Sequence, residues 1–476
     1  MKLKAIPYYC IRTIYLVLIS LLMLYCKPEE SDVAPDVNES PKKLLLYNSG
    51  SWKLSSVPAS FPEADLDSNI ASGFNRGFIS WYTIDHSIFY EKKSPLRPPN
   101  ITNSELSNYM VFMILETMVY PYRDIPNGEP ILLTPLEISF YPEERGPYNF
   151  DTYPSNYSEG INEYGKLFNP ESRWGGIMRK LDSLDFQFNY FDFWLLDPLR
   201  YDDEISGELY INIGQFSEDI LQDGKKFSEQ EINLQSLENN DTTCWGIVPN
   251  EILGNFSFEN ELEQDFGLDG LNDIGERAFF ADYLNNIQNI CNDEVYQTIY
   301  NDPANDDYHC YRGEDYDNSY LYTSIVERYK RFSNLEGNTN TEVVGISSGG
   351  FYAGRTKQPD SENLNYVDNF QTSNSYFEYR IDIDQQALSV ENENYLVDIY
   401  ECVGIRLANG EMGSVKFYHF RIPIENFNQI IGNPILNGNY KSIRIFLKRF
   451  NKPVVLRLID PYLSEEVIDE EAEYWN

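Results

Sequence analysis

An acidic run between residues 265 and 276 carries the residue types and spacing of a cation site. As a twelve-residue loop it places carboxylates at positions 1, 5, 9 and 12, which are Asp265, Asp269, Asp273 and Glu276. Gly270 stands at position 6, where an EF-hand loop needs a sharp turn. A hard cation such as Ca²⁺ takes about six to eight oxygen ligands, so the spacing predicts calcium as the cofactor of this run.

The same run departs from the EF-hand pattern at two positions. Position 3 is Gly267, which has no side-chain ligand, and position 8 is Asn272 instead of an aliphatic residue. The alternative is an acidic turn that caps the following helix, with Asp273 and Glu276 near its positive end. Both interpretations stay open, whereas the second acidic turn, residues 302–307, is expected to be structural.

Two short motifs resemble catalytic or phosphate-binding signatures without the surroundings that these signatures need. Residues 345–349 read G-I-S-S-G, as in a nucleophile elbow, but a polar loop follows Ser347 where a helix is required. Residues 349–356 mimic a P-loop, yet Arg355 replaces the lysine that reaches the phosphates. We expect loop glycines at both places, no catalytic residues and no enzymatic activity.

Histidines and cysteines are too scattered in the sequence to predict a metal cluster. His86, His309 and His419 are interpreted as core or surface side chains. No C-x-x-C motif occurs, so a zinc ribbon or thioredoxin motif is excluded. An exported location would permit disulfides, and isolated buried thiols are the alternative. The cysteines beyond residue 26 are Cys244, Cys291, Cys310 and Cys402.

The first 25 residues have the pattern of an export signal. Three basic residues precede a mostly apolar run from residue 14 to residue 25, which is too short for a transmembrane helix. Cys26 stands where a lipobox ends, although Tyr25 occupies a position that usually holds a small residue. The following K-P-E-E is similar to the surface-export signal of outer-membrane lipoproteins. We predict lipidation of Cys26, with a plain signal peptide as the alternative.

Charge and composition narrow the function classes. The chain has 476 residues, with 75 acidic and 37 basic side chains, and its formal charge of −38 would repel nucleic acid. Nucleic-acid binding is therefore not expected. The 37 Tyr, 28 Phe and 6 Trp favour strands with half-buried positions.

Apolar and polar residues alternate, as expected of strands, in both the first and the second half of the chain. Residues 190–196 alternate and stop at an Asp-Pro pair, and residues 376–383 alternate again. A capping-box pattern from Thr102 to Glu105 predicts a helix over 104–119, and further helices are expected at 217–224, near Gly275 and after residue 325. The predicted fold class is mainly β with an α insertion: two antiparallel, jelly-roll-like β-sandwich lobes separated by a helical, acidic region.

The predicted organisation has five parts. They are a lipoprotein signal peptide at 1–25, a flexible tether at 26–43, a first β-sandwich lobe at 44–215, a helix-rich acidic insertion at 216–335, and a second β-sandwich lobe with an acidic tail at 336–476. The tether has three prolines and no hydrophobic periodicity, so it would hold the folded body away from a membrane.

The most specific sequence features lie between residues 141 and 227. They are Y-P-E-E-R-G-P-Y-N at 141–149, W-G-G-I-M-R at 174–179, F-W-L at 193–195 and S-E-D at 217–219. Together with motifs such as F-R-I-P at 420–423, they resemble the SprA family of gliding-motility and type IX secretion proteins at the cell surface. The resemblance runs from about Ser51 to Trp475, in order and spacing.

The resemblance implies a role in secretion or motility and no reaction. SprA proteins are several times longer, so it implies one extramembrane segment, and no translocation pore is inferred. We expect an outer-membrane lipoprotein, at the cell surface rather than the periplasmic face, that serves as a scaffold or accessory component with secretion or motility proteins as partners. The alternative, suggested by jelly-roll periodicity and aromatic content, is a surface glycan-binding module.

Overall fold

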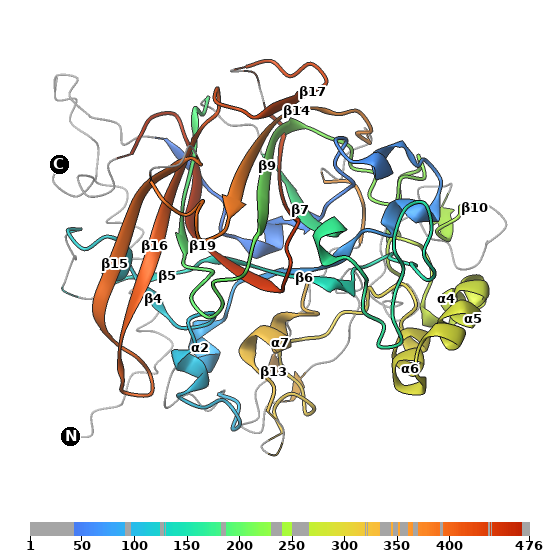
Figure 1. The fold of residues 1–476 in the computed structure, drawn as a ribbon, viewed down its shortest axis with the longest axis horizontal. Helices are drawn as coiled ribbons and strands as arrows, with labels where there is room; N and C mark the ends of the chain where they lie inside the picture. Colours follow the sequence, from blue (N-terminus) through green and yellow to red (C-terminus); the bar gives the residue numbers. More distant parts are fainter. Residues whose placement is uncertain are drawn as a thin grey trace, which may run out of the picture. The chain divides into compact units, whose positions relative to one another are not determined.

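The computed structural model shows a body of antiparallel β-sheet with helices at one side (Figure 1). It describes residues 42–468 except for short internal segments. These segments are 91–96, 124–127, 129, 182–186, 230–239, 250–265, 319, 321, 334–343, 346–350, 353–359, 365–369, 391–393, 437 and 439. All described residues belong to one unit.

Most of the described strands lie in two sheets. The seven-stranded sheet has the order β15-β16-β8-β19-β6-β3, and β1 pairs with the end of β19. Its strands are β1 (Lys43–Leu45), β3 (Gly77–Tyr82), β6 (Leu136–Arg145), β8 (Tyr190–Leu196), β15 (Leu396–Arg406), β16 (Met412–Pro423) and β19 (Val454–Ser464). The six-stranded sheet has the order β17-β14-β9-β18-β7-β2. Its strands are β2 (Lys53–Leu54), β7 (Trp174–Lys180), β9 (Gly207–Gln215), β14 (Ser375–Ile383), β17 (Gln429–Ile431) and β18 (Ser442–Lys448).

The main apolar core contains side chains from both sheets. In the six-stranded sheet, Ile211 of β9 stands between Tyr379 of β14 and Ile445 of β18, and all three are buried. In the seven-stranded sheet, Phe193 stacks on its cross-strand neighbour Phe420 with ring centroids 5.2 Å apart. Such cross-strand rows stabilise both the pairing and the interface between sheets. The predicted mainly β, sandwich-type fold is confirmed.

The pairing corrects the prediction of two separate lobes. β8 lies between β16 and β19, and β9 lies between β14 and β18. Each sheet therefore contains strands from residues 44–215 interleaved with strands from residues 336–476. The two parts of the chain build one sandwich together. Alternation along a sequence shows which face of a strand is buried, but it does not show which strand is its neighbour.

The outer face of the seven-stranded sheet is covered by residues 105–120. The predicted helix over 104–119 is wrong, because this segment contains a 3₁₀ turn, a short strand and one helical turn. These are η4 (Glu105–Ser107), β4 (Ile114–Leu115) and α3 (Glu116–Val119). The Asn108 side chain accepts a hydrogen bond from the Met110 amide, which favours a turn over a helix. Phe112 and Val119 then pack in one cluster with Trp194.

The predicted helical insertion is confirmed between residues 273 and 329. Its helices are α4 (Asp273–Phe279), α5 (Ala281–Ile290), α6 (Asp293–Asn301) and α7 (Ile325–Tyr329). The side chains of Asn272, Asn292 and Ser324 cap α4, α6 and α7. The predicted helix at 217–224 is a series of turns instead, in which the Asp219 carboxylate accepts the amides of residues 223 and 224. Across the described residues, none of the helices has the length and apolar character needed to cross a membrane.

His86, at the start of α2 (His86–Phe89), gives the fold a pH dependence. Neither buried ring nitrogen has a hydrogen-bond partner. Burial, followed by the charge of Arg457, lowers the pKa of His86 from 6.5 to about 4, and Asp85 opposes this shift. The unfolded chain binds the proton more readily, so this group costs about 3 kcal/mol of stability as the pH falls from 7 to 4.

We therefore expect the variant His86→Leu to lose less stability between pH 7 and pH 4 than the wild type. Leucine leaves no buried polar atom without a partner, so the fold should tolerate it at pH 7. Chemical denaturation at several pH values measures the difference. Parallel pH profiles for the two proteins would contradict the prediction.

Candidate functional site

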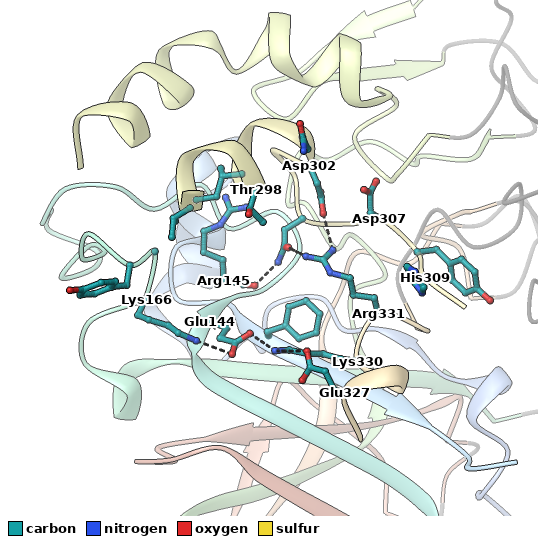
Figure 2. A pocket seen from close by; sticks show the side chains of 18 of the residues that line it. Glu144, Arg145, Lys166, Thr298, Asp302, Asp307, His309, Glu327, Lys330 and Arg331 are labelled. Atoms are coloured by element: carbon teal, nitrogen blue, oxygen red, sulfur yellow. Dashed lines mark hydrogen bonds and ion pairs between the residues drawn. The ribbon is translucent and has the colours of Figure 1, made fainter. Parts of the chain in front are cut away.

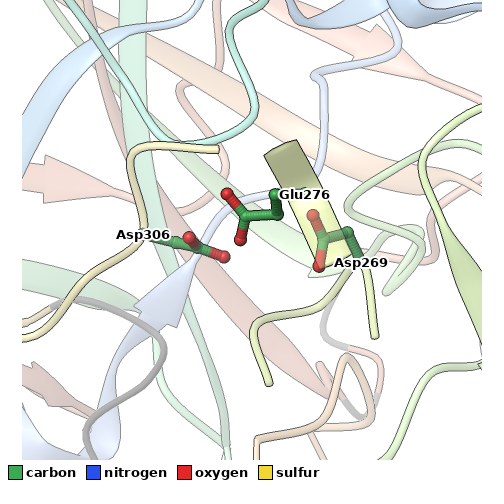
Figure 3. Close-up of side chains that lie close together, drawn as sticks. All are labelled: Asp269, Glu276 and Asp306. Atoms are coloured by element: carbon green, nitrogen blue, oxygen red, sulfur yellow. The ribbon is translucent and has the colours of Figure 1, made fainter. Parts of the chain in front are cut away.

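Three buried carboxylates meet beside the helical insertion (Figure 3). Asp269 precedes α4, Glu276 lies in the first turn of α4, and Asp306 lies in the loop after α6. One oxygen from each residue lies within 4.8 Å of the others, and each residue is at most 1% exposed. We call Asp269, Glu276 and Asp306 the carboxylate cluster.

Each carboxylate of the cluster has one oxygen held by the protein and one that is not. Asp269 accepts the Leu271 amide at 2.9 Å, Glu276 accepts the Ala304 amide at 2.9 Å, and Asp306 accepts the Tyr148 hydroxyl at 2.8 Å. The second oxygen of each is buried and has no hydrogen-bond partner within the part of the chain that the structure describes. Buried polar atoms are rarely left in this state in native proteins.

Burial makes the charged form of the cluster unfavourable. It raises the pKa of Asp269 to about 8 and that of Glu276 to about 12, and the charges of neighbouring carboxylates add to both shifts. The pKa of Asp306 is also raised by burial and then by the charges of Asp269 and Asp302. The nearby Asp302 carboxylate is itself paired with Arg331 at 2.8 Å. The cluster therefore needs protons or a cation to balance its charge.

Only some of the predicted calcium ligands lie close together in the structure. Asp269 and Glu276 come together, whereas Asp265 lies outside the described residues. Asp273 is not part of the cluster, because at the start of α4 it forms an ion pair with Arg277 at 3.6 Å. Asp306 replaces it, although its turn was expected to be purely structural. The only sequence signal for Asp306 is the high number of acidic residues at 302–307. Asp306 is 30 residues away from Glu276, so the sequence does not predict that the two side chains meet.

A polar cavity of about 570 Å³ lies beside the same loops (Figure 2). Glu144 at the end of β6 pairs with Lys166 at 2.9 Å and with Lys330 at 2.6 Å. Arg331 bridges Asp302 and Asn305 on the opposite wall. The charged side chains on these walls are therefore paired with one another. The pairs also connect the sandwich, through Glu144, to the helical insertion, through Asp302.

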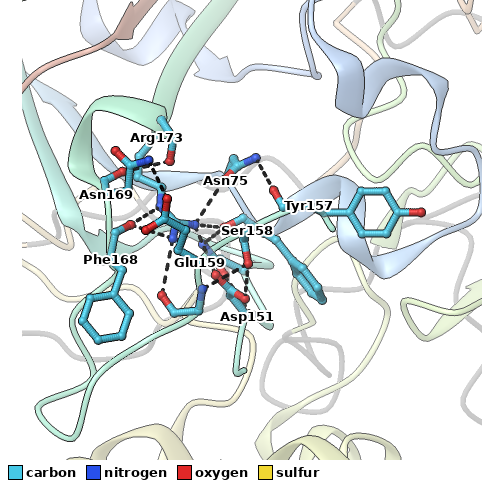
Figure 4. A network of polar contacts seen from close by, with 12 residues as sticks. Asn75, Asp151, Tyr157, Ser158, Glu159, Phe168, Asn169 and Arg173 are labelled. Atoms are coloured by element: carbon cyan, nitrogen blue, oxygen red, sulfur yellow. Dashed lines mark hydrogen bonds and ion pairs between the residues drawn. The ribbon is translucent and has the colours of Figure 1, made fainter. Parts of the chain in front are cut away.

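A second polar network, centred on Arg173, fastens the loop between β6 and β7 (Figure 4). The Arg173 guanidinium is fully buried and pairs with buried Asp151 at 3.2 Å. It also donates to the carbonyls of Phe74 and Phe168 at 2.7 and 2.8 Å. Ser158 donates to the same Asp151 carboxylate. This network holds backbone segments and offers no open position to a substrate.

The remaining predicted site residues fall in several places. Cys26 and Ser347 lie outside the described residues. His419 stacks on Trp194 and pairs with Asp192, which also binds Arg421 at 2.6 Å. No disulfide joins the described cysteines, which agrees with the alternative of isolated thiols.

The comparison with known families found a match, which lies in the second half of the chain. Residues 282–463 match the family model SprA_N, which is described as a motility related/secretion protein. This segment is SprA-like. The SprA-like segment runs from α5 to β19 and includes Asp306, whereas Asp269 and Glu276 precede it. No curated protein matches the sequence.

The SprA-like segment does not contain the whole sandwich. Its strands β14, β16, β18 and β19 pair with β6, β7, β8 and β9, which come from earlier in the chain. The motifs W-G-G-I-M-R and F-W-L lie on these earlier strands β7 and β8. They therefore line the same two sheets as the matched segment, and their aromatic side chains Trp174 and Phe193 are buried.

Proposed function

We propose that the protein is a non-catalytic scaffold or accessory component of a secretion or motility machinery, in particular type IX secretion or gliding, attached to the outer membrane at the cell surface. The SprA_N match over residues 282–463 is the observation that carries this proposal. A formal charge of −38 suits a basic protein partner and disfavours nucleic acid.

The proposed attachment is a lipid on Cys26. Two or more acyl chains anchor a protein stably, whereas one chain binds only reversibly. A polar tether at residues 27–43 would then separate the sandwich from the membrane. Cys26 and residues 27–41 of the tether lie outside the described residues, so the sequence pattern alone supports this part.

We expect Cys26→Ser to release the protein from the outer-membrane fraction and to abolish incorporation of labelled palmitate. Cys10→Ser is the matched control, because residue 10 lies within the predicted signal peptide and should change neither readout. Affinity capture of the wild type from solubilised outer membrane should recover secretion or motility proteins. Recovery of none of these, together with normal secretion and gliding in a deletion strain, would refute the proposed function.

A glycan-binding module is the second candidate. A cavity of about 490 Å³ is lined by Tyr120, Tyr122 and Trp194 together with Asp398 and Arg421. Aromatic faces beside charged groups suit a sugar ring, and Tyr122 is 75% exposed. A glycan array should then show binding that Tyr122→Ala weakens. An array that is silent across polysaccharide classes would remove this candidate.

A further inference from the structure

The carboxylate cluster holds three buried oxygens that form no hydrogen bond with any group of the described residues. These atoms are Oδ2 of Asp269, Oε1 of Glu276 and Oδ1 of Asp306. Figure 3 shows the three carboxylates close together, with Asp269 and Glu276 from the stretch around the start of α4 and Asp306 from the loop after α6. We propose that Asp269, Glu276 and Asp306 bind one hard divalent cation, Ca²⁺, which fastens the helical insertion to the sandwich.

The dimensions of the cluster fit a single ion. Calcium–oxygen distances are about 2.3–2.6 Å, so two ligands on opposite sides of one Ca²⁺ lie about 4.6–5.2 Å apart and adjacent ligands lie closer. The three carboxylates offer oxygens within 4.8 Å of one another. Because every donor is an oxygen, the set favours Ca²⁺ or Mg²⁺ over zinc, which prefers nitrogen and sulfur.

The surrounding hydrogen bonds hold the ligands in place. The amides of Leu271 and Ala304 and the hydroxyl of Tyr148 each bind the other oxygen of one carboxylate. The same Tyr148 hydroxyl accepts the Leu268 amide at 2.6 Å. Partners of this kind orient ligands toward a metal, and here they leave one oxygen per carboxylate for the ion.

The local cations do not neutralise the cluster. Arg331 is engaged by Asp302 and Asn305, and Arg145 donates to the Pro303 carbonyl and the Tyr283 hydroxyl. Three buried carboxylates without a counter-charge are costly, and a divalent ion removes most of that cost. Ca²⁺ is favoured over Mg²⁺, because Mg²⁺ gives up its water reluctantly and these carboxylates are at most 1% exposed.

The ion would connect two stretches of the chain. Asp269 precedes α4 and Glu276 lies in its first turn, whereas Asp306 belongs to the loop after α6. That loop is already joined to the sandwich, because the Tyr148 amide donates to the Ala304 carbonyl at 2.7 Å. Bound Ca²⁺ should therefore stabilise the native state and order the loops beside the polar cavity.

The test uses the full mature protein after chelation and dialysis. Isothermal titration with CaCl₂ should show about one site per chain, and saturating Ca²⁺ should raise the melting temperature by roughly 3 °C or more. MgCl₂ at equal concentration should give a smaller shift, and KCl at equal ionic strength should give none. No heat and no shift with CaCl₂ would overturn the proposal, and an equal or larger shift with MgCl₂ would overturn the choice of ion.

Glu276→Gln keeps the shape of the side chain and removes one ligand charge. We expect at least about 10-fold weaker Ca²⁺ binding, while the calcium-free variant melts no lower than the calcium-free wild type because repulsion in the cluster is relieved. Asp306→Asn is the second variant, should the first fail to fold. Asp273→Asn is the matched control on the same helix and should bind Ca²⁺ like the wild type. Lost binding in Asp273→Asn with normal binding in Asp306→Asn would refute the cluster and favour the loop of residues 265–276.

Discussion

A fragment of residues 44–215 will not fold by itself. Within this fragment, β3 still has β6 and β2 still has β7, but β8 loses both β16 and β19, and β9 loses both β14 and β18. The buried rows on β8 and β9 would then face water, including Phe193 and Ile211, which are at most 1% exposed in the whole protein. Such a loss removes the sheet interface that supplies most of the apolar burial.

Circular dichroism and thermal unfolding test this expectation. The fragment should show no cooperative transition, whereas residues 42–476 should show one. Residues 336–476 should fail in the same way, because β14 and β18 lose β9 and β16 loses β8. A sharp, reversible transition in either fragment would mean that the sequence forms two independent lobes after all.

Arg173→Met will lower the free energy of unfolding by about 3–5 kcal/mol. The guanidinium and its partner Asp151 are both fully buried, so methionine leaves an uncompensated carboxylate in the interior. The Phe168 carbonyl also loses its guanidinium donors, and the Phe74 carbonyl keeps the Asn149 amide but loses the guanidinium. Urea denaturation followed by tryptophan fluorescence measures the loss.

An exposed ion pair supplies the matched control for this prediction. Lys452 pairs with Asp202 and Glu204 at 2.8 Å, yet its side chain is 37% exposed. Lys452→Met should cost less than about 1 kcal/mol, because solvent screens surface pairs. Adding Asp151→Asn to Arg173→Met should recover part of the loss. Equal losses for Arg173→Met and Lys452→Met would contradict the structural role of the network.

Strand positions were largely predictable from side-chain alternation. The strand predicted at residues 190–196 is β8, and the one predicted at residues 376–383 is β14. β15 was not predicted, and it is an edge strand with several exposed apolar residues, such as Val397 and Val403. An edge strand buries less of either face, so its pattern is weaker.

Helix predictions failed where apolar spacing had another cause. Leu106 and Met110 are spaced as on a helix, but the turn at Asn108 separates them and the segment covers a sheet instead. The helix after Asn272 was predictable, because its cap and its apolar stripe occur together. A helix is predicted reliably when a capping residue and a periodic apolar face occur together. Either signal by itself is insufficient.

The sequence by itself determined the fold class of this protein and its resemblance to a known family. Alternating aromatic and β-branched residues favour antiparallel sheet, and the motif set resembles the SprA family, whose model matches residues 282–463. It also predicted a calcium loop that includes Asp269 and Glu276, with a helix-capping turn as the alternative.

Tertiary structure alone decided which strands are neighbours and which carboxylates meet. One sandwich forms from both ends of the chain, and Asp306 completes the cluster from beyond α6. The physical reason is the same in both cases. Periodicity and spacing report interactions within a few residues, whereas sheet pairing and buried charge depend on segments far apart in sequence that fold into contact.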